Sequence, residues 1–179
     1  NNAGIAYHNP TDEEAKFTIQ TNFLSVIKLT DKLIPLLAED GKILNMSSSL
    51  GLFSGQGETL RKALEEPKLD LPRLLEVANN FLELTKDYQP GNFSKDPSYP
   101  GSKALLNAYT SRILPGQLGA NQQVYAICPG WCRTDMGTDS ASLPAEAGAD
   151  TPLYLIELPF KKDPELNGKF IHERKVQGY

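Results

Sequence analysis

The sequence has 179 residues, 40% hydrophobic and 22% charged, which is enough to form one domain with a buried core. Its formal net charge is −4 and its Lys and Arg residues are scattered, which argues against a nucleic-acid partner. No apolar stretch approaches the roughly 18–20 residues of a membrane span. Two cysteines exclude a disulfide framework, favour a reducing compartment and, with only two histidines, make a zinc site unexpected. We therefore expect a cytoplasmic protein without membrane segments or bound metal.

The first third of the chain predicts a turn, a long helix and a strand. Asn1-Asn2-Ala3-Gly4-Ile5 is typical of a strand end or tight turn, because Asn and Gly tolerate positive φ. Residues 11–37 have helical spacing of apolar side chains, with Thr11 or Asp12 as the cap. Residues 41–46 predict a short strand, which enters a Ser-rich turn at 47–51.

The remaining chain continues the alternation of helices and strands. Residues 52–97 are polar and broken by Gly and Pro, with helical texture at 60–66 and 71–88. Beyond them we expect a helix at 98–114, a strand at 124–128, a helix near 144–158 and a strand at 169–172. This order is typical of a parallel α/β sheet, in which ligands bind beyond the carboxyl ends of the strands. Ser48 and the Pro129-Gly130 loop follow two of these strands.

Tyr99 and Lys103 are four residues apart, so they would lie on one face of the predicted helix. A phenol has a pKa of about 10, and a nearby ammonium favours its ionised form. Such a pair can pass a proton to or from a substrate oxygen. The alternative is a surface cation stacked on an aromatic ring.

Ser48 and Asn22 are candidates for the same site. A Ser hydroxyl at a strand end can hydrogen-bond a substrate carbonyl, although Ser in a turn often caps its own backbone. Asn22 falls inside a predicted helix, where Asn is mildly unfavourable, and its alternative is simple exposure to solvent. Cys128 and Cys132 are expected to pack as small hydrophobic residues, and Trp131 either lines a pocket or covers the core.

Five short motifs occur in register: Asn1-Asn2-Ala3-Gly4, Thr21-Asn22-Phe23, Asn45-Met46-Ser47-Ser48, Tyr99-x3-Lys103 and Pro129-Gly130-x3-Thr134. Together they resemble the Asn–Ser–Tyr–Lys tetrad and flanking motifs of the short-chain dehydrogenase/reductase family. The string at 128–136 and Gly168-Lys169-Phe170-Ile171 are similar to its carbonyl reductase branch. The resemblance covers essentially the whole chain. It implies an α/β fold, the C-terminal portion of a Rossmann-like doubly wound parallel sheet, forming a single domain over 1–179 with a helical insert at about 52–97.

The resemblance also implies roles for individual residues. Tyr99 would protonate a ketone, aldehyde or quinone oxygen, Lys103 would lower the tyrosine pKa and contact the ribose, and Ser48 would hold the carbonyl. Asn22 would anchor a water that leads protons from Lys103 to solvent. The expected NADP(H)-binding residues are Asn2, Ala3, Gly4, Tyr99, Lys103, Pro129, Gly130, Cys132 and Thr134. Ser48 is preferred over Ser47 because Ser48-Ser49-Leu50-Gly51 matches the Ser-x-x-Gly turn.

Three features depart from the family pattern. No Gly-rich phosphate-binding turn is present, so we expect the sequence to be a partial record of a longer chain. Pro100 should place Tyr99 at the helix boundary, and Pro115-Gly116 should end that helix. The resemblance also implies that the insert covers the helices that family members use to dimerise, and hence a monomer. The alternative is that the insert is a mobile lid over the substrate, or serves both purposes.

Two other functional classes compete with a reductase. A serine hydrolase would need a Ser-His-acid set, but the Ser-rich turn lacks the Gly-x-Ser-x-Gly elbow and His172 is the only downstream histidine. A non-catalytic binding or structural module that keeps the reductase fold is the more serious alternative, since folds outlive functions.

Overall fold

A four-stranded sheet in the order β1-β2-β3-β4 lies at the centre of the computed structural model, which describes residues 1–90, 94–159 and 163–179. The strands are β1 (Lys42–Met46), β2 (Gln123–Cys128), β3 (Phe170–His172) and β4 (Lys175–Gln177). β1, β2 and β3 run parallel, with Leu44 opposite Tyr125 and Ile127 opposite Ile171, whereas β4 returns antiparallel to β3. The predicted α/β fold with a parallel sheet is confirmed.

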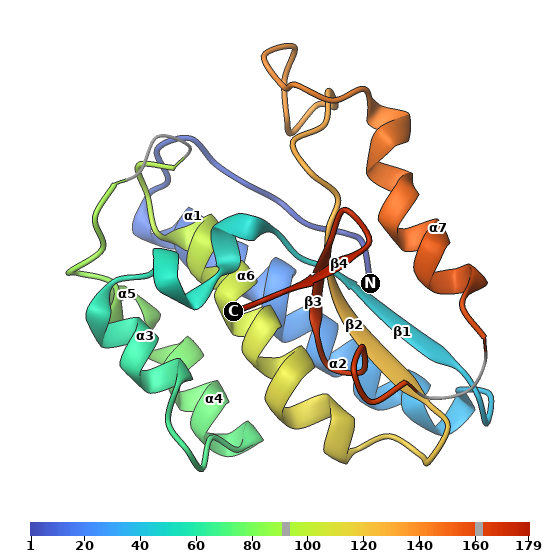
Figure 1. The fold of residues 1–179 in the computed structure, drawn as a ribbon. Helices are drawn as coiled ribbons and strands as arrows, with labels where there is room; N and C mark the ends of the chain where they lie inside the picture. The colour runs from blue at the N-terminus through green and yellow to red at the C-terminus, as the bar shows by residue number, and fades with distance from the viewer. Residues whose placement is uncertain (91–93, 160–162) are drawn as a thin grey trace.

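Helices cover both faces of the sheet. They are α1 (Asp12–Ile19), α2 (Ser25–Leu33), α3 (Glu58–Leu64), α4 (Leu71–Asn79), α5 (Phe81–Leu84), α6 (Ser98–Ala108) and α7 (Asp150–Glu157). In Figure 1, α2 and α6 lie on one face and α7 on the opposite face. Side chains of β2 point alternately to the two faces of the sheet. Val124 belongs to the core on the side of α6, whereas Tyr125 and Ile127 pack with Leu155 of α7 on the other side.

The two long predicted helices each contain a π-helical turn. The capping box of Thr11 and Glu14 begins α1, and the turn Gln20–Leu24 then joins α1 to α2 without a break in the chain direction. After α6 a second π-helical turn, Tyr109–Ile113, leads into a 3₁₀ turn at Leu114–Gly116. Pro115 therefore ends the helix where the sequence predicted, since proline cannot continue the hydrogen-bond ladder.

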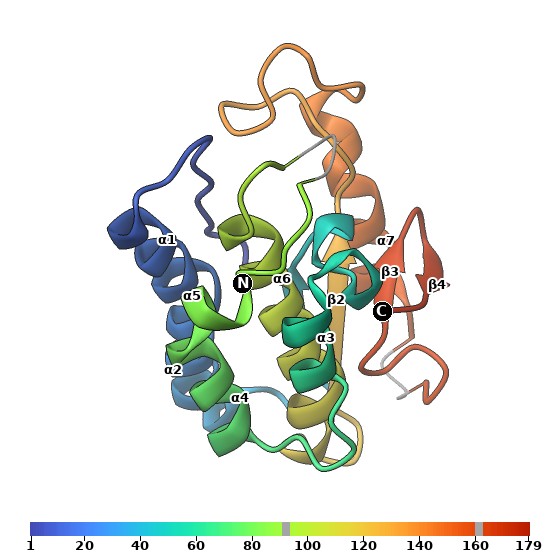
Figure 2. The ribbon, with the colours of Figure 1, turned by 90° about the vertical axis from the view of Figure 1, so that its left-hand side faces the viewer.

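The insert forms a layer of its own outside α6. Figure 2 shows α3, α4 and α5 beside α6, on the side away from β3 and β4. The Phe81 ring lies so close to α6 that a Cβ on Gly101 would come 2.3 Å from its Cε2 atom. Arg112 donates to the carbonyls of Leu64 and Glu66, both at 2.6 Å, and so closes the end of α3. These contacts hold the insert against the helix that carries Tyr99.

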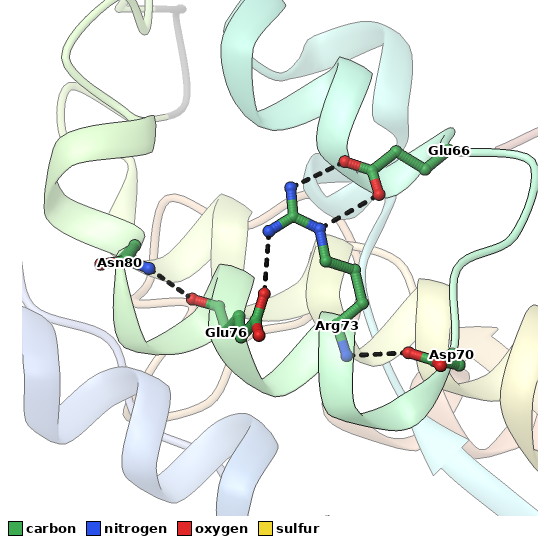
Figure 3. Close-up of polar contacts among 5 residues, drawn as sticks. All are labelled: Glu66, Asp70, Arg73, Glu76 and Asn80. Carbon is green, nitrogen blue, oxygen red and sulfur yellow. Dashed lines mark hydrogen bonds and ion pairs between the residues drawn. The ribbon is translucent and has the colours of Figure 1, made fainter.

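The connection between α3 and α4 is held by polar contacts (Figure 3). Arg73 donates to both carboxylate oxygens of Glu66, at 2.8 and 3.1 Å, and to Glu76 at 3.1 Å. Asp70 caps α4 by accepting from the Arg73 amide at 2.9 Å, and Asn80 donates to the Glu76 carbonyl. Residues 71–88, predicted as one helix, are therefore two helices that meet at Asn80.

The sequence analysis missed β4 altogether. Its hairpin with β3 turns at Glu173 and Arg174, whose φ angles are 49° and 61°. A two-residue turn with positive φ at both positions usually carries Asn or Gly, and neither occurs here. The strand is also short and exposed, so its three residues carry no alternating apolar pattern.

Candidate active site

The carboxyl ends of β1 and β2 lie side by side at one edge of the sheet, and the turn that follows β1 packs on α6 (Figure 1). The turn after β1 carries Ser48, and α6 carries Tyr99 and Lys103. The N-terminal segment around Gly4 reaches the same place, where a Cβ on Gly4 would lie 3.5 Å from Lys103 Nζ. Parallel strands put their carboxyl ends on one edge, which explains why motifs far apart in sequence come together.

Tyr99 is the second residue of α6, whose first turn begins after Pro97. Pro100 fits within this turn because a first-turn amide has no partner inside the helix. The Lys103 ammonium lies 5.6 Å from the centroid of the Tyr99 ring and donates to the Met46 carbonyl at 2.8 Å. The predicted helix-face pair is therefore present, with Lys103 only 4% exposed.

Burial dominates the electrostatics of the pair. It raises the pKa of the Tyr99 phenol above its usual value, and a hydrogen bond with Ser48 offsets part of this increase. Burial also lowers the pKa of Lys103 to about 8, because the charged ammonium loses its water. The expected lowering of the tyrosine pKa thus comes from Ser48 rather than from Lys103, and the net direction is upward.

The two adjacent serines have different surroundings. Ser47 is buried and its Oγ donates to Asn107 Oδ1 at 2.6 Å. Ser48 is half-buried, and its Oγ accepts from the Leu50 amide at 3.2 Å. Because that oxygen is held as an acceptor, its own proton can point at Tyr99 or at a substrate oxygen. Ser48, and not Ser47, is the serine that affects the pKa of the Tyr99 phenol.

Asn22 lies in the π-helical turn and is 1% exposed, so the alternative of a solvent-facing amide is wrong. Its Oδ1 accepts from the Ile5 amide at 2.8 Å, and its Nδ2 donates to the Ile5 carbonyl at 2.9 Å and to Ser102 Oγ at 3.0 Å. Ser102 in turn donates to the Tyr99 carbonyl at 2.7 Å. The Asn22 side chain therefore joins the N-terminal segment to the first turn of α6.

The N-terminal segment runs beside β1 before it reaches Asn22. The Asn1 backbone nitrogen donates to the Leu44 carbonyl, and the Asn1 carbonyl accepts from the Met46 amide, both at 2.9 Å. Asn2 and Ala3 are exposed, whereas Gly4 is packed, with Asn22 Oδ1 3.3 Å from the position of a Cβ. A side chain at position 4 would thus press on both Asn22 and Lys103.

The loop after β2 is the expected other wall of the site, since Cys128 at the end of β2 lies near Tyr99 and Lys103. Pro129 and Gly130 follow β2 directly, and Gly130 has the left-handed φ of 85° that favours glycine. The exposed Thr134 accepts from the Gly137 amide at 3.2 Å, and Trp131 Nε1 donates to the Gly137 carbonyl at 3.0 Å. Trp131 is 44% exposed, so it covers no core.

The two thiols lie at either end of the Pro129-Gly130 turn. Cys128 is buried, close enough to Tyr99 and Lys103 to affect the pKa of both. Burial raises the pKa of the Cys132 thiol. Among residues 1–90, 94–159 and 163–179, no group of three or more His, Cys, Asp or Glu could hold a metal ion. Nor is any helix in those ranges long and apolar enough to cross a bilayer.

Two buried polar residues at the site, Ser102 and Asn107, were not singled out from the sequence, and Ser47 was weighed only as the alternative to Ser48. Ser102 precedes Lys103, and Asn107 follows it by four residues, on the same helix face. That spacing was the available signal, but a lone Asn or Ser in a helix is uninformative without its partner.

Comparison with known proteins shows which family this chain belongs to. Carbonyl reductase (NADPH) 3 of Rattus norvegicus is 33% identical over 99% of this chain, which spans 68% of that protein. The chain belongs to the carbonyl reductases of the short-chain dehydrogenase/reductase family. Carbonyl reductase (NADPH) 1 of Sus scrofa is 31% identical over 98% of the chain, which spans 64% of that relative. The predicted family is thus confirmed, although no family model matches.

Solved structures show the same fold. Salutaridine reductase from Papaver somniferum superposes with a TM-score of 0.78 and 30% identity over 92% of this carbonyl reductase chain, which spans 56% of that structure. The NADPH-bound carbonyl reductase from chicken fatty liver gives a TM-score of 0.61 over 99% of the chain at 22% identity. The segment described here therefore corresponds to about two thirds of the relatives it matches.

Proposed function

We propose that the full-length protein reduces a ketone, aldehyde or quinone to the alcohol with NADPH, with Tyr99 as the general acid. The observation that carries this proposal is the meeting of Tyr99, Ser48 and Lys103 at the carboxyl ends of β1 and β2. The mammalian relatives are named as NADPH carbonyl reductases, which favours the same cofactor and substrate class here.

Each residue of the site has a task in that reaction. Ser48, with its oxygen held by the Leu50 amide, donates its proton to the substrate carbonyl and so fixes the oxygen beside Tyr99. The Tyr99 phenol then gives its proton to this oxygen as negative charge develops there. Because burial raises the pKa of Tyr99, the phenol stays protonated at neutral pH and is ready to act as an acid.

Bound NADPH would supply the hydride that reaches the carbonyl carbon. The residues of this chain fit the nicotinamide end of such a cofactor, because the N-terminal segment at Gly4 passes close to Lys103 without a side chain and Gly130 lets the backbone turn sharply. We assign Lys103 and Tyr99 to the ribose side, and Thr134 with the backbone of Pro129, Gly130 and Cys132 to the carboxamide side. Asn2, Ala3 and Gly4 would contact the adenosine side.

Asn22 holds the N-terminal segment next to Lys103. Both amide protons of Asn22 bond to protein atoms, while its Oδ1 keeps one free acceptor position. We propose that this region binds the water through which Lys103 exchanges protons with solvent and returns Tyr99 to its protonated form.

We also propose a cytoplasmic monomer without a nucleic-acid partner. The insert packs Phe81 and Leu60 over Gly101, so the outer face of α6 is already covered. Light scattering of the full-length protein at micromolar concentration should give a monomer mass, and a stable dimer would contradict the proposal. Deleting residues 57–89 should expose apolar surface and promote association.

The test of the reaction is NADPH oxidation by the full-length protein with a panel of ketones, aldehydes and quinones. We expect oxidation that depends on the carbonyl compound and yields the alcohol in equal amount. Tight NADPH binding without turnover on any carbonyl would instead favour the non-catalytic module that keeps the reductase fold.

A further inference from the structure

Asn107 lies one helical turn after Lys103 on α6, and its side chain is fully buried. Its Oδ1 accepts from Ser47 Oγ at 2.6 Å, and its Nδ2 donates to the Gly51 carbonyl at 2.8 Å. Ser47 and Gly51 are the first and last residues of the turn that carries Ser48. A single buried amide therefore contacts both ends of this turn, which we call the serine turn (residues 47–51).

The serine turn is packed directly on α6. A Cβ on Gly51 would lie 2.6 Å from both the carbonyl carbon and the Cβ of Lys103, so the two backbones touch. Inside the turn, the Gly51 amide donates to the Ser48 carbonyl at 2.9 Å. The Ser47 amide donates to the Ile127 carbonyl of β2 at 2.7 Å, which fixes where the turn leaves the sheet. Beside this backbone contact and the 3.4 Å bond from Ser47 Oγ to the Lys103 carbonyl, Asn107 adds two side-chain hydrogen bonds between the turn and α6.

We propose that Asn107 is a positioning residue for carbonyl reduction, because it sets the place of the Ser48 hydroxyl relative to the Tyr99 phenol. Tyr99 lies on the same helix about two turns earlier, so α6 carries both the proton donor and the anchor of the serine turn. This inference rests on the proposed function and gives Asn107 no contact with substrate or cofactor. The side-chain oxygen and the side-chain nitrogen of Asn107 both bond to other atoms of the protein.

The electrostatics of Tyr99 agree with this assignment. The hydrogen bond with Ser48 lowers the pKa of Tyr99 against the effect of burial. If the serine turn moves away from α6, this bond is weakened and the pKa of Tyr99 rises further. The pH dependence of turnover should then shift to higher pH, which a uniform loss of folded protein would not cause.

The test compares Asn107→Ala with a matched control, Thr110→Val, in the full-length protein. Thr110 is also fully buried on the same helical run, and its hydroxyl bonds to Asn45 Nδ2 at 2.8 Å and to the Leu106 carbonyl at 2.7 Å, both outside the serine turn. We expect Asn107→Ala to lower kcat by about 10- to 100-fold, because small displacements of a reacting group are costly. The Kd for NADPH should stay within about twofold in both variants, since neither side chain is among the proposed cofactor contacts. Thr110→Val should keep its kcat within about threefold despite a lower Tm.

Amide hydrogen exchange gives a second measurement that needs no turnover. Exchange at Gly51 and Leu52 should be about tenfold faster or more in Asn107→Ala and unchanged in Thr110→Val. If Asn107→Ala fails to fold, Ser47→Ala removes only one of the two contacts and should lower kcat about three- to tenfold, with faster exchange at the same amides.

The outcomes separate this inference from the proposed function. An active wild-type protein with unchanged kcat and exchange in Asn107→Ala would overturn the role of Asn107 and leave the reductase proposal standing. Equal losses of kcat in Asn107→Ala and Thr110→Val would also overturn it, because they indicate a general loss of stability. A wild-type protein that reduces no carbonyl would overturn the reductase proposal, while the exchange data would still decide whether Asn107 holds the serine turn.

Discussion

The two walls of the proposed site are built in different ways. On the wall formed by α6 and the serine turn, the polar side chains are buried and hydrogen-bonded within the protein: Ser47 donates to Asn107, and Lys103 donates to the Met46 carbonyl. On the wall formed by the loop after β2, Trp131 and Met136 are exposed and the polar contacts stay within the loop. A proton donor must be held at a fixed place before substrate arrives. A ligand-binding loop, in contrast, forms its polar contacts to the ligand only in the complex.

We expect the largest loss of turnover from a substitution in the buried wall formed by α6 and the serine turn. Tyr99→Phe removes only the hydroxyl and keeps the ring, so we expect turnover to fall by about 10²–10⁴-fold, the usual contribution of a general acid. The Kd for NADPH should change little. Steady-state NADPH oxidation and cofactor titration measure the two quantities. A variant with more than about a tenth of the wild-type kcat would rule out the acid role.

Lys103 faces both the tyrosine and the proposed ribose position, so its removal should affect two quantities. Lys103→Ala should lower kcat and weaken NADPH binding, each by about 10- to 100-fold, as expected for a hydrogen bond from a charged donor. Fluorescence titration of NADPH gives the binding constant independently of turnover. An unchanged Kd would contradict the ribose contact.

The burial of Lys103 also predicts a pH dependence of stability. Its pKa is lowered from 10.5 to about 8, so between these values the unfolded chain binds more protons than the folded one. The free energy of unfolding should therefore rise with pH in this window, by on the order of 2 kcal/mol by about pH 10. Below about pH 8 Lys103 is protonated in both states, so this rise should be absent there. Urea unfolding of wild type and Lys103→Met at about pH 7 and about pH 10 isolates this contribution. The stability difference should shift in favour of the wild type at the higher pH; a constant difference would mean that Lys103 is hydrated.

The smallest effect is expected on the exposed wall. Thr134→Val removes one hydroxyl from a loop that keeps most of its internal contacts, so NADPH binding should weaken only several-fold, with kcat nearly unchanged. Ser140→Ala, in the same loop but outside the proposed contacts, is the matched control. A loss of kcat as large as that of Tyr99→Phe would show that the loop takes part in chemistry, and the contrast between the two walls would fail.

The sequence was sufficient to predict which motifs come together at the carboxyl ends of the strands, whereas the catalytic roles of the tetrad rest on the family resemblance and stay predictions. Tyr99 and Lys103 follow from helical spacing, and Ser48 follows from its place at the end of a strand. The hydrogen bonds that hold these residues in place could not be predicted from the sequence. Ser47 and Asn107 are sixty residues apart, and their hydrogen bond depends on how β1 and α6 pack. The π-helical turn around Asn22 and the hairpin of β4 likewise depend on tertiary contacts that override local propensity.

The central claim is that Ser48 and Tyr99 act on one carbonyl oxygen as a unit. A double-mutant cycle of Ser48→Ala, Tyr99→Phe and the double variant, measured as kcat for one ketone in the full-length protein, tests it directly. Ser48→Ala alone should lower kcat by about 10²–10³-fold, and Ser49→Ala, its exposed neighbour, should not. We predict that the double variant is no slower than Tyr99→Phe by more than about threefold, as found when groups depend on one another. Losses that multiply in full would mean that the two residues act independently, and would contradict the account.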